Sequence, residues 1–128
     1  GLLEARQIPD VDFMVEKIDS LAPGVRPALL HGDLWGGNYL ISKNNTPYLI
    51  DPSVYFGHSE VDLAMSRLFG GFSSRFYDAY FEVSPALPGF EDRVALYQLY
   101  YLLVHLNIFG RSYLASVTDA VGAVFGAH

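Results

Sequence analysis

The sequence predicts a mostly helical α+β chain that carries one small β-hairpin. Apolar residues recur at helical spacing over most of the chain, while two short strand-like segments flank the polar run Lys43–Thr46. No repeat or low-complexity tract interrupts this pattern. The length of 128 residues suits one domain, and a hydrophobic content of 51% suffices for one buried core. We therefore expect residues 1–128 to form a single domain.

The first part of the chain is expected to hold one helix and the hairpin. A helix is predicted to begin near Asp10, because apolar residues then recur at helical spacing until the breaker run 22–24. A short apolar run follows at 28–30. The segments 38–42 and 47–51 are expected to pair as strands, because turn-forming residues separate them.

The rest of the chain is expected to be an irregular loop followed by helices. Pro52 and Gly57 are breakers, so the segment 52–59 is predicted to be irregular. Gly110 is a suitable C-terminal cap for the longest helix. Helices are predicted over four segments, which are the one that begins at Glu60, then Phe72–Phe81, Glu91–Phe109 and Ser112–Phe125.

Composition excludes several classes of partner. The net charge of −6 gives no general attraction for phosphate backbones, so we expect no nucleic-acid partner. The chain has no cysteine, which rules out a disulfide framework and a cysteine-based zinc site. No segment is apolar over a membrane-spanning length and none resembles a signal peptide, so we expect no membrane contact and a cytoplasmic location. The oligomeric state is not predicted.

Two carboxylates, one amide and one histidine occur at fixed spacing around the predicted hairpin. They belong to the run His31-Gly32-Asp33-Leu34-Trp35-Gly36-Gly37-Asn38 and to the later run Ile50-Asp51-Pro52. Asn38 enters the first strand and Asp51 leaves the second, and the two ends of a hairpin lie close in space. Asp33 lies on the loop just before them. This arrangement can place three oxygen donors around one hydrated magnesium ion and an incoming hydroxyl group.

Phosphoryl transfer requires such a set of residues. Mg²⁺ neutralises phosphate oxygens and prefers carboxylate and amide oxygens plus water, so Asp51 and Asn38 are the predicted metal and cofactor ligands. A separate carboxylate must orient the acceptor hydroxyl and take its proton, and Asp33 suits this role. His31 completes the predicted catalytic loop, where we expect it to hold the loop by hydrogen bonds.

The spacing matches the kinase signature H-x-D-L-x-x-x-N followed by a metal-binding Asp. Three departures separate the chain from protein kinases. Gly32 replaces their arginine, Pro52-Ser53 replaces their Phe-Gly, and Trp35 occupies the position of a lysine. These changes indicate a kinase of small molecules.

Four runs carry a more specific likeness, namely 31–38, 51–65, 67–72 and 96–107. Together they resemble the fructosamine kinase (ketosamine 3-kinase) family, over roughly Arg26 to Leu114. The resemblance implies the fold of the aminoglycoside phosphotransferase and protein kinase superfamily, with this chain as part of the C-terminal lobe. It further implies ATP, Mg²⁺ and phosphorylation of a sugar hydroxyl on a small-molecule or protein-bound ketosamine. The phosphorylated adduct is then unstable, so the activity counts as deglycation repair.

The resemblance also indicates what these 128 residues lack. They contain no glycine-rich phosphate loop, and neither Lys17 nor Lys43 lies on a suitable strand. We therefore expect the N-terminal, nucleotide-binding lobe to be absent and the chain alone to have little or no kinase activity. Within the lobe we assign a catalytic loop at 31–38, a metal-site loop at 51–59 and a helical remainder at 60–128.

Three further residues are candidates for contact with the substrate. Trp35 could pack on a sugar face or be a core aromatic residue. His58 and Glu60 follow the metal-site loop, and Glu60 could instead be a carboxylate that favours the start of a helix. Asp62 is expected to tie the catalytic loop to the following helix. His105 is expected to be a hydrogen-bonded core residue.

Three other functions stay open at this point. The chain could belong to another sugar, choline or aminoglycoside kinase of the same superfamily, with the same catalytic residues and a different pocket. It could be a truncated, non-catalytic binding domain. A metal hydrolase built on His31, Asp33 and Asp51 is a more distant alternative, because it would require further histidines at metal-ligand spacing.

Overall fold

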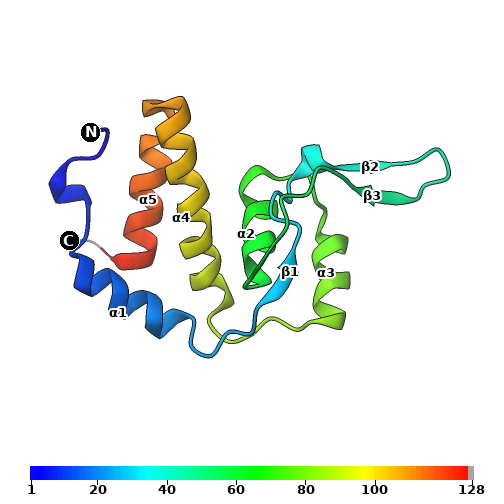
Figure 1. Ribbon diagram of the computed structural model, residues 1–128, viewed down its shortest axis with the longest axis horizontal. Coiled ribbons are helices and arrows are strands. Elements are labelled where there is room, and N and C mark those ends of the chain that lie inside the picture. Colours follow the sequence, from blue (N-terminus) through cyan, green and yellow to red (C-terminus); the bar gives the residue numbers. More distant parts are fainter. Residues whose placement is uncertain (127–128) are drawn as a thin grey trace. The chain divides into compact units, whose positions relative to one another are not determined.

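The computed structural model describes residues 1–126, which divide into two compact units (Figure 1). One unit is Arg26–Phe90, and the other combines Gly1–Val25 with the chain from Glu91 onward. Helices make up most of the described chain, and the strands form two separate two-stranded sheets. The predicted α+β, mostly helical class is confirmed. Among the described residues, no helix is long and apolar enough to cross a membrane.

The discontinuous unit is helical, and its first long helix is α1 (Val11–Leu21). The carboxylate of Asp10 caps this helix by accepting the backbone N–H groups of Asp12 and Phe13 at 3.0 and 3.2 Å. The predicted start near Asp10 is therefore confirmed. Short η1 (Ala5–Gln7) precedes α1.

The other helices of this unit are α4 (Phe90–Phe109), η3 (Arg111–Tyr113) and α5 (Leu114–Phe125). The ring of Phe13 on α1 lies edge-on to Phe125 on α5, with 6.4 Å between centroids. The guanidinium of Arg93 on α4 donates to the carbonyl of Leu21 at the end of α1, at 3.2 Å. The last helix was predicted from Ser112, but η3 occupies its expected first turn.

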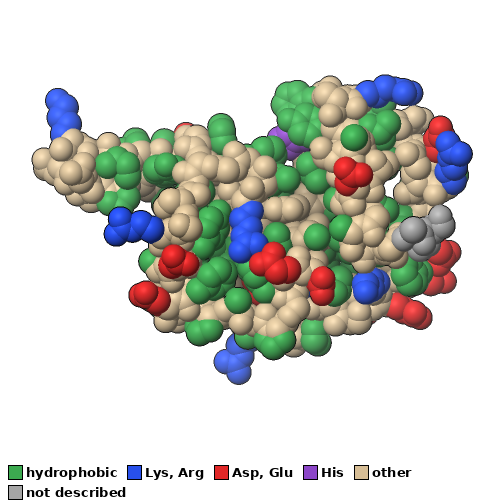
Figure 2. Space-filling model, turned by 180° about the vertical axis from the view of Figure 1, so that it is seen from behind, with side chains coloured by type: hydrophobic (Ala, Val, Ile, Leu, Met, Phe, Trp, Pro, Cys, Tyr) green, Lys and Arg blue, Asp and Glu red, His purple; other side chains and the backbone are tan. Residues whose placement is uncertain are grey.

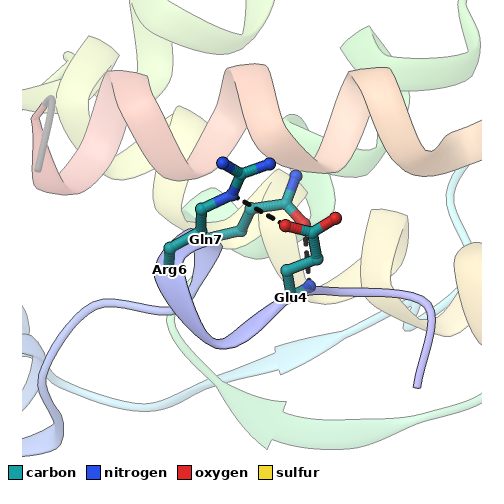
Figure 3. A network of polar contacts seen from close by, with 3 residues as sticks. All are labelled: Glu4, Arg6 and Gln7. Atoms are coloured by element: carbon teal, nitrogen blue, oxygen red, sulfur yellow. Dashed lines mark hydrogen bonds and ion pairs between the residues drawn. The ribbon is translucent and has the colours of Figure 1, made fainter.

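Polar contacts join Glu4, which precedes η1, to Arg6 and Gln7 within it (Figure 3). The backbone N–H of Glu4 donates to the side-chain oxygen of Gln7 at 2.8 Å, and Arg6 Nε lies 2.7 Å from a carboxylate oxygen of Glu4. Both charged side chains are mostly exposed, at 83% and 65%. Water screens such a pair, so it stabilises the turn only weakly.

The continuous unit, Arg26–Phe90, contains the predicted hairpin as β2 (Tyr39–Ile41) and β3 (Pro47–Leu49). The strands are antiparallel and shorter than predicted, with Tyr39 opposite Leu49. Asn45 adopts a left-handed conformation (φ 58°) in the turn, which asparagine tolerates well. The hairpin projects from the rest of this unit (Figure 1), and hydrophobic side chains lie on its surface (Figure 2).

The prediction that 52–59 is irregular throughout is wrong in its second half. Residues Tyr55–Gly57 form β4, which pairs antiparallel with β1 (Ala28–Leu30) and places Tyr55 opposite Leu30. A three-residue strand is stabilised mainly by its partner, and here the partner lies far earlier in the chain. Aromatic Tyr55 and Phe56 favour a strand and were the available local signal.

Two helices complete this unit, namely α2 (Glu60–Phe69) and α3 (Ser74–Val83). The first begins where predicted, whereas the second begins two residues later than the predicted Phe72. Leu63 and Ser66 of α2 are almost fully buried, and the hydroxyl groups of Ser66 and Tyr77 lie 3.0 Å apart across the two helices. This packing gives α2 a fixed place from which its polar face can bind the catalytic loop.

Candidate active site

The catalytic loop begins at His31, whose two ring nitrogens bind different segments. Nδ1 accepts the backbone N–H of Asp33 at 3.2 Å, so Nε2 carries the proton and donates it to the carbonyl of Ile50 at 2.8 Å. The backbone N–H of Ser53 donates to the carbonyl of His31 at 2.8 Å. His31 therefore joins the catalytic loop to the segment on either side of Asp51.

The carboxylate of Asp62 holds the same loop from helix α2. One oxygen accepts the N–H of His31 at 2.7 Å and the other accepts the N–H of Gly32 at 3.0 Å. Hydrogen bonds to an ionised acceptor are shorter and stronger than those between neutral groups. The sequence indicated this tie between loop and helix, and the structure shows its two bonds.

Gly32 permits the metal-site loop to approach the catalytic loop. It has a φ of 86°, a conformation that side chains rarely adopt, and a Cβ built on it would lie 1.8 Å from the carbonyl oxygen of Ser53. A side chain at this position would push the two loops apart. The same contact explains why the arginine of protein kinases has no place here.

Asn38 and Asp33 lie together, as the spacing predicted. The side-chain nitrogen of Asn38 donates to the Asp33 carboxylate at 2.8 Å and to the Asp33 carbonyl at 2.9 Å. Because both partners are acceptors, the amide orientation is determined and its oxygen remains as a ligand atom. Asn38 is only 6% exposed, and its carbonyl accepts the N–H of Ile50 at 2.9 Å, which extends the hairpin ladder.

Asp51 follows directly after Ile50 and has an exposed side chain. Its neighbours fix its backbone, since Ile50 bonds His31 and Asn38 while Ser53 bonds His31. Asp51 has a φ of 49°, which is uncommon for a residue with a side chain. Such conformations persist where the surroundings impose them and cluster at functional sites.

The oxygens available at this site are of the kinds that Mg²⁺ prefers as ligands. The Asp51 carboxylate is exposed, and the Asn38 amide keeps its oxygen while its nitrogen binds Asp33. Mg²⁺ usually takes one or two protein ligands and completes its shell with water and substrate phosphates. The described residues contain no cluster of three His, Cys, Asp or Glu side chains of the kind that forms an all-protein metal cage.

Trp35 lies within the catalytic loop and is 41% exposed, so it is not a core aromatic residue. Its ring lies against the backbone of Gly37, where an added Cβ would come within 2.3 Å of a ring atom. Trp35 also precedes η2 (Gly36–Asn38), and its carbonyl accepts the N–H of Asn38 at 2.9 Å. The indole is thus supported by backbone at Gly37, while the side chain stays partly accessible to solvent.

His58 and Glu60 form a separate pair beyond the end of β4. His58 Nδ1 lies 3.7 Å from a Glu60 carboxylate oxygen, and both side chains are nearly buried. They line a cavity of about 120 Å³ with residues of α2 and α3. Gly57 pairs with Ala28, three residues before His31, and Asp62, two residues after Glu60 on α2, binds the backbone of His31.

Sequence reasoning did not identify the contact between the catalytic loop and the segment that joins α2 to α3. The N–H of Gly36 donates to the carbonyl of Gly70 at 3.2 Å, and the backbones of Gly36 and Gly71 touch. Two glycine pairs, Gly36-Gly37 and Gly70-Gly71, were the available signal, because paired glycines often mark a close approach of two backbones.

A model of the family described as fructosamine kinase matches residues 4–126, and the chain belongs to this family. One relative is the "probable ketoamine kinase" of Lactiplantibacillus plantarum, which is 57% identical over 95 residues, 74% of this chain and 34% of that protein. The mouse ketosamine-3-kinase is 53% identical over 90 residues, 70% of this chain and 29% of that protein.

The fold comparison agrees with the family assignment. A solved structure from Thermobifida fusca, named as a candidate fructosamine-3-kinase, superposes with a TM-score of 0.84 at 40% identity. The match covers 97% of this chain and 43% of that one. The chain spans about a third of the length of the curated relatives it matches.

Proposed function

We propose that this chain is the catalytic-loop part of the C-terminal lobe of an ATP-dependent kinase that phosphorylates a sugar hydroxyl of fructosamines and related ketosamines, free or protein-bound. The observation that carries the proposal is the 2.8 Å bond between the Asn38 amide and the Asp33 carboxylate, within a loop that His31 and Asp62 hold from both sides. Membership of the fructosamine kinase family supports it. The names of the relatives from L. plantarum and mouse also support it.

In this proposal Asp33 is the catalytic carboxylate. Asn38 binds one oxygen, Oδ2, and thereby orients the group, while Oδ1 is left to accept a hydrogen bond from the acceptor hydroxyl. As the hydroxyl oxygen bonds to the terminal phosphorus of ATP, the bond from that phosphorus to the bridging oxygen breaks and ADP leaves, while the hydroxyl proton passes to the carboxylate. His31 fixes the backbone of Asp33 and takes no proton, because both of its ring nitrogens are already engaged.

The nucleotide phosphates are proposed to bind on the side of Asp51. The Asp51 carboxylate and the Asn38 amide oxygen would hold Mg²⁺, which supplies charge neutralisation at the phosphate oxygens when it is bound. The 128 residues include no glycine-rich phosphate loop. We therefore propose that the chain by itself has little or no kinase activity.

Trp35 is proposed to support the acceptor sugar. An aromatic face packs well on the apolar face of a sugar ring, and the indole is half-exposed two residues after Asp33 in the catalytic loop. The proposal that His58 and Glu60 also contact substrate has weaker support, because their cavity of about 120 Å³ is smaller than typical ligand pockets. We further propose a cytoplasmic location, which an acidic chain without cysteine fits.

An acceptor assay on the complete protein that carries these 128 residues tests the proposal. With ATP and Mg²⁺, a fructosamine such as fructosyl-lysine is expected to give a sugar phosphate that ³¹P NMR detects. Choline, an aminoglycoside and an unmodified hexose serve as competing acceptors. A clear preference for one of these three over the fructosamine would contradict the proposal. The 128-residue chain alone is assayed in parallel, and appreciable turnover there would contradict the proposed need for a nucleotide-binding lobe.

A further inference from the structure

Two backbones touch where the catalytic loop meets the segment between α2 and α3. The N–H of Gly36 donates to the carbonyl of Gly70 at 3.2 Å. A Cβ on Gly36 would lie 2.9 Å from the Cα of Gly71, and a Cβ on Gly71 would lie 2.4 Å from the Cα of Gly36. The opposing atoms are backbone atoms that cannot rotate away, so the contact requires glycine on both sides.

The same segment also binds the residue that directly follows the catalytic loop. Tyr39, which follows Asn38, donates its hydroxyl to the carbonyl of Gly71 at 2.9 Å. The rings of Tyr39 and Phe72 also pack, with 5.1 Å between centroids. The segment 70–72 therefore contacts the chain at Gly36 and at Tyr39, which are the first residue of η2 and the residue just after it.

Asn38 and Trp35, which have roles in the proposed phosphoryl transfer, lie at or next to these two contact points. Asn38 is the last residue of η2, and its amide binds the Asp33 carboxylate at 2.8 Å. Trp35 directly precedes Gly36, and its ring lies on Gly37. A shift of Gly36 would move the indole and the amide together, because only Gly36 and Gly37 lie between Trp35 and Asn38.

We propose that Gly36 and Gly71 are positioning residues, whose contact fixes Trp35 and Asn38 for the sugar acceptor. The identity of the acceptor in this inference rests on the proposed function. The contact between Gly36 and Gly71 rests on the structure alone. Separating the two backbones displaces the aromatic support and turns the amide that orients Asp33. Displacement of reacting groups by about 1 Å can cost on the order of 10²-fold in rate.

Gly36→Ala in the complete protein is the main variant. Gly36 does not have a positive φ, so alanine introduces no backbone strain of its own and acts only through the collision. We expect kcat/KM for the fructosamine to fall on the order of 10²-fold, while KM for ATP with Mg²⁺ changes less than about threefold. Gly71→Ala introduces the collision from the other side of the contact. We expect it also to lower kcat/KM for the fructosamine while changing KM for ATP little.

Gly110→Ala is the matched control. Gly110 has a φ of 81°, so alanine strains the backbone there, yet an added Cβ meets nothing within 4 Å and the residue takes no part in the contact with Gly36. We expect this variant to lose stability and to keep its kinetic constants for the fructosamine. The proposal is overturned if Gly36→Ala keeps normal kcat/KM, or if Gly110→Ala loses as much as Gly36→Ala and Gly71→Ala do.

A spectroscopic test does not depend on the identity of the acceptor. Trp35 is the single tryptophan of these 128 residues, so the emission that the complete protein loses in Trp35→Phe belongs to the catalytic loop. We expect Gly36→Ala and Gly71→Ala to shift the maximum of this Trp35 emission and increase its quenching by iodide, and Gly110→Ala to leave both unchanged. Unchanged emission in Gly36→Ala and Gly71→Ala would overturn the positioning role, even if the fructosamine assay fails for the unmodified protein.

Discussion

At the scale of single residues, the site depends on a missing side chain as much as on the charged ones. Gly32 has a φ of 86°, and the carbonyl of Ser53 occupies the space that a Cβ would fill. That close approach allows the N–H of Ser53 to reach the carbonyl of His31 at 2.8 Å. The position of Asp51 relative to the catalytic loop therefore depends on residue 32 being glycine.

Gly32→Ala is expected to separate the two loops. Alanine would pay the left-handed conformational cost of about 1–2 kcal/mol and would also collide with Ser53. Gly24→Ala is the matched control, because Gly24 has a φ of 65° and an added Cβ meets nothing within 4 Å. Chemical denaturation should show a larger loss in the free energy of unfolding for Gly32→Ala than for Gly24→Ala. Equal losses would show that the Ser53 contact contributes nothing.

The residue pattern predicted Asp33 and Asn38 as neighbours, and the structure brings them together. The signature works because its spacing follows from the geometry of a loop that enters a hairpin. It could not predict that the Asn38 nitrogen reaches both the carboxylate and the carbonyl of Asp33, because these two bonds depend on where the two acceptors lie.

At the scale of secondary structure elements, helix α2 and the β1–β4 pair together hold the start of the catalytic loop. The buried face of α2 includes Leu63 and Ser66, while Asp62 on the same helix binds the backbone of His31 and Gly32. The pairing of Leu30 with Tyr55 places the start of the loop beside the segment that follows Asp51.

Asp62→Asn is expected to loosen the loop without removing the helix. An amide can accept only one of the two backbone N–H groups with its oxygen, and its NH₂ group faces the other donor. We expect a loss of about 1–3 kcal/mol in the free energy of unfolding. Amide hydrogen exchange should also become faster at His31 and Gly32. Asp78→Asn, at an exposed position on α3, is the control, and exchange at His31 and Gly32 as slow in Asp62→Asn as in this control would contradict the role of Asp62.

Elements whose signal is local were predictable, and those that depend on distant partners were not. The α1 helix has its own cap in Asp10, and the hairpin has its own turn, so both were found. Strand β4 has only three residues and is stabilised by pairing with β1. The nearby breakers Pro52 and Gly57 therefore led to the prediction of an irregular segment. The start of α3 was predicted two residues early, at Phe72, which lies before the helix and packs its ring on Tyr39.

At the scale of the whole molecule, the described residues supply a catalytic loop and a candidate metal ligand on one compact unit. That unit also exposes apolar side chains on its strands, including Leu29, Phe56 and Leu49 at 64%, 74% and 59%. The chain spans about a third of its curated relatives, so turnover is a property to be measured on the complete protein. The family assignment rests on a match over residues 4–126, which includes every residue of the proposed site.

The turnover of an Asp33→Asn variant of the complete protein tests the central claim most directly. Asparagine keeps the size of the side chain and cannot accept the proton of the acceptor hydroxyl. With a fructosamine, ATP and Mg²⁺, we predict that kcat falls by about 10²- to 10⁴-fold while nucleotide affinity stays within about twofold of normal. Near-normal kcat in Asp33→Asn would contradict the assignment of Asp33 as the carboxylate that accepts the proton.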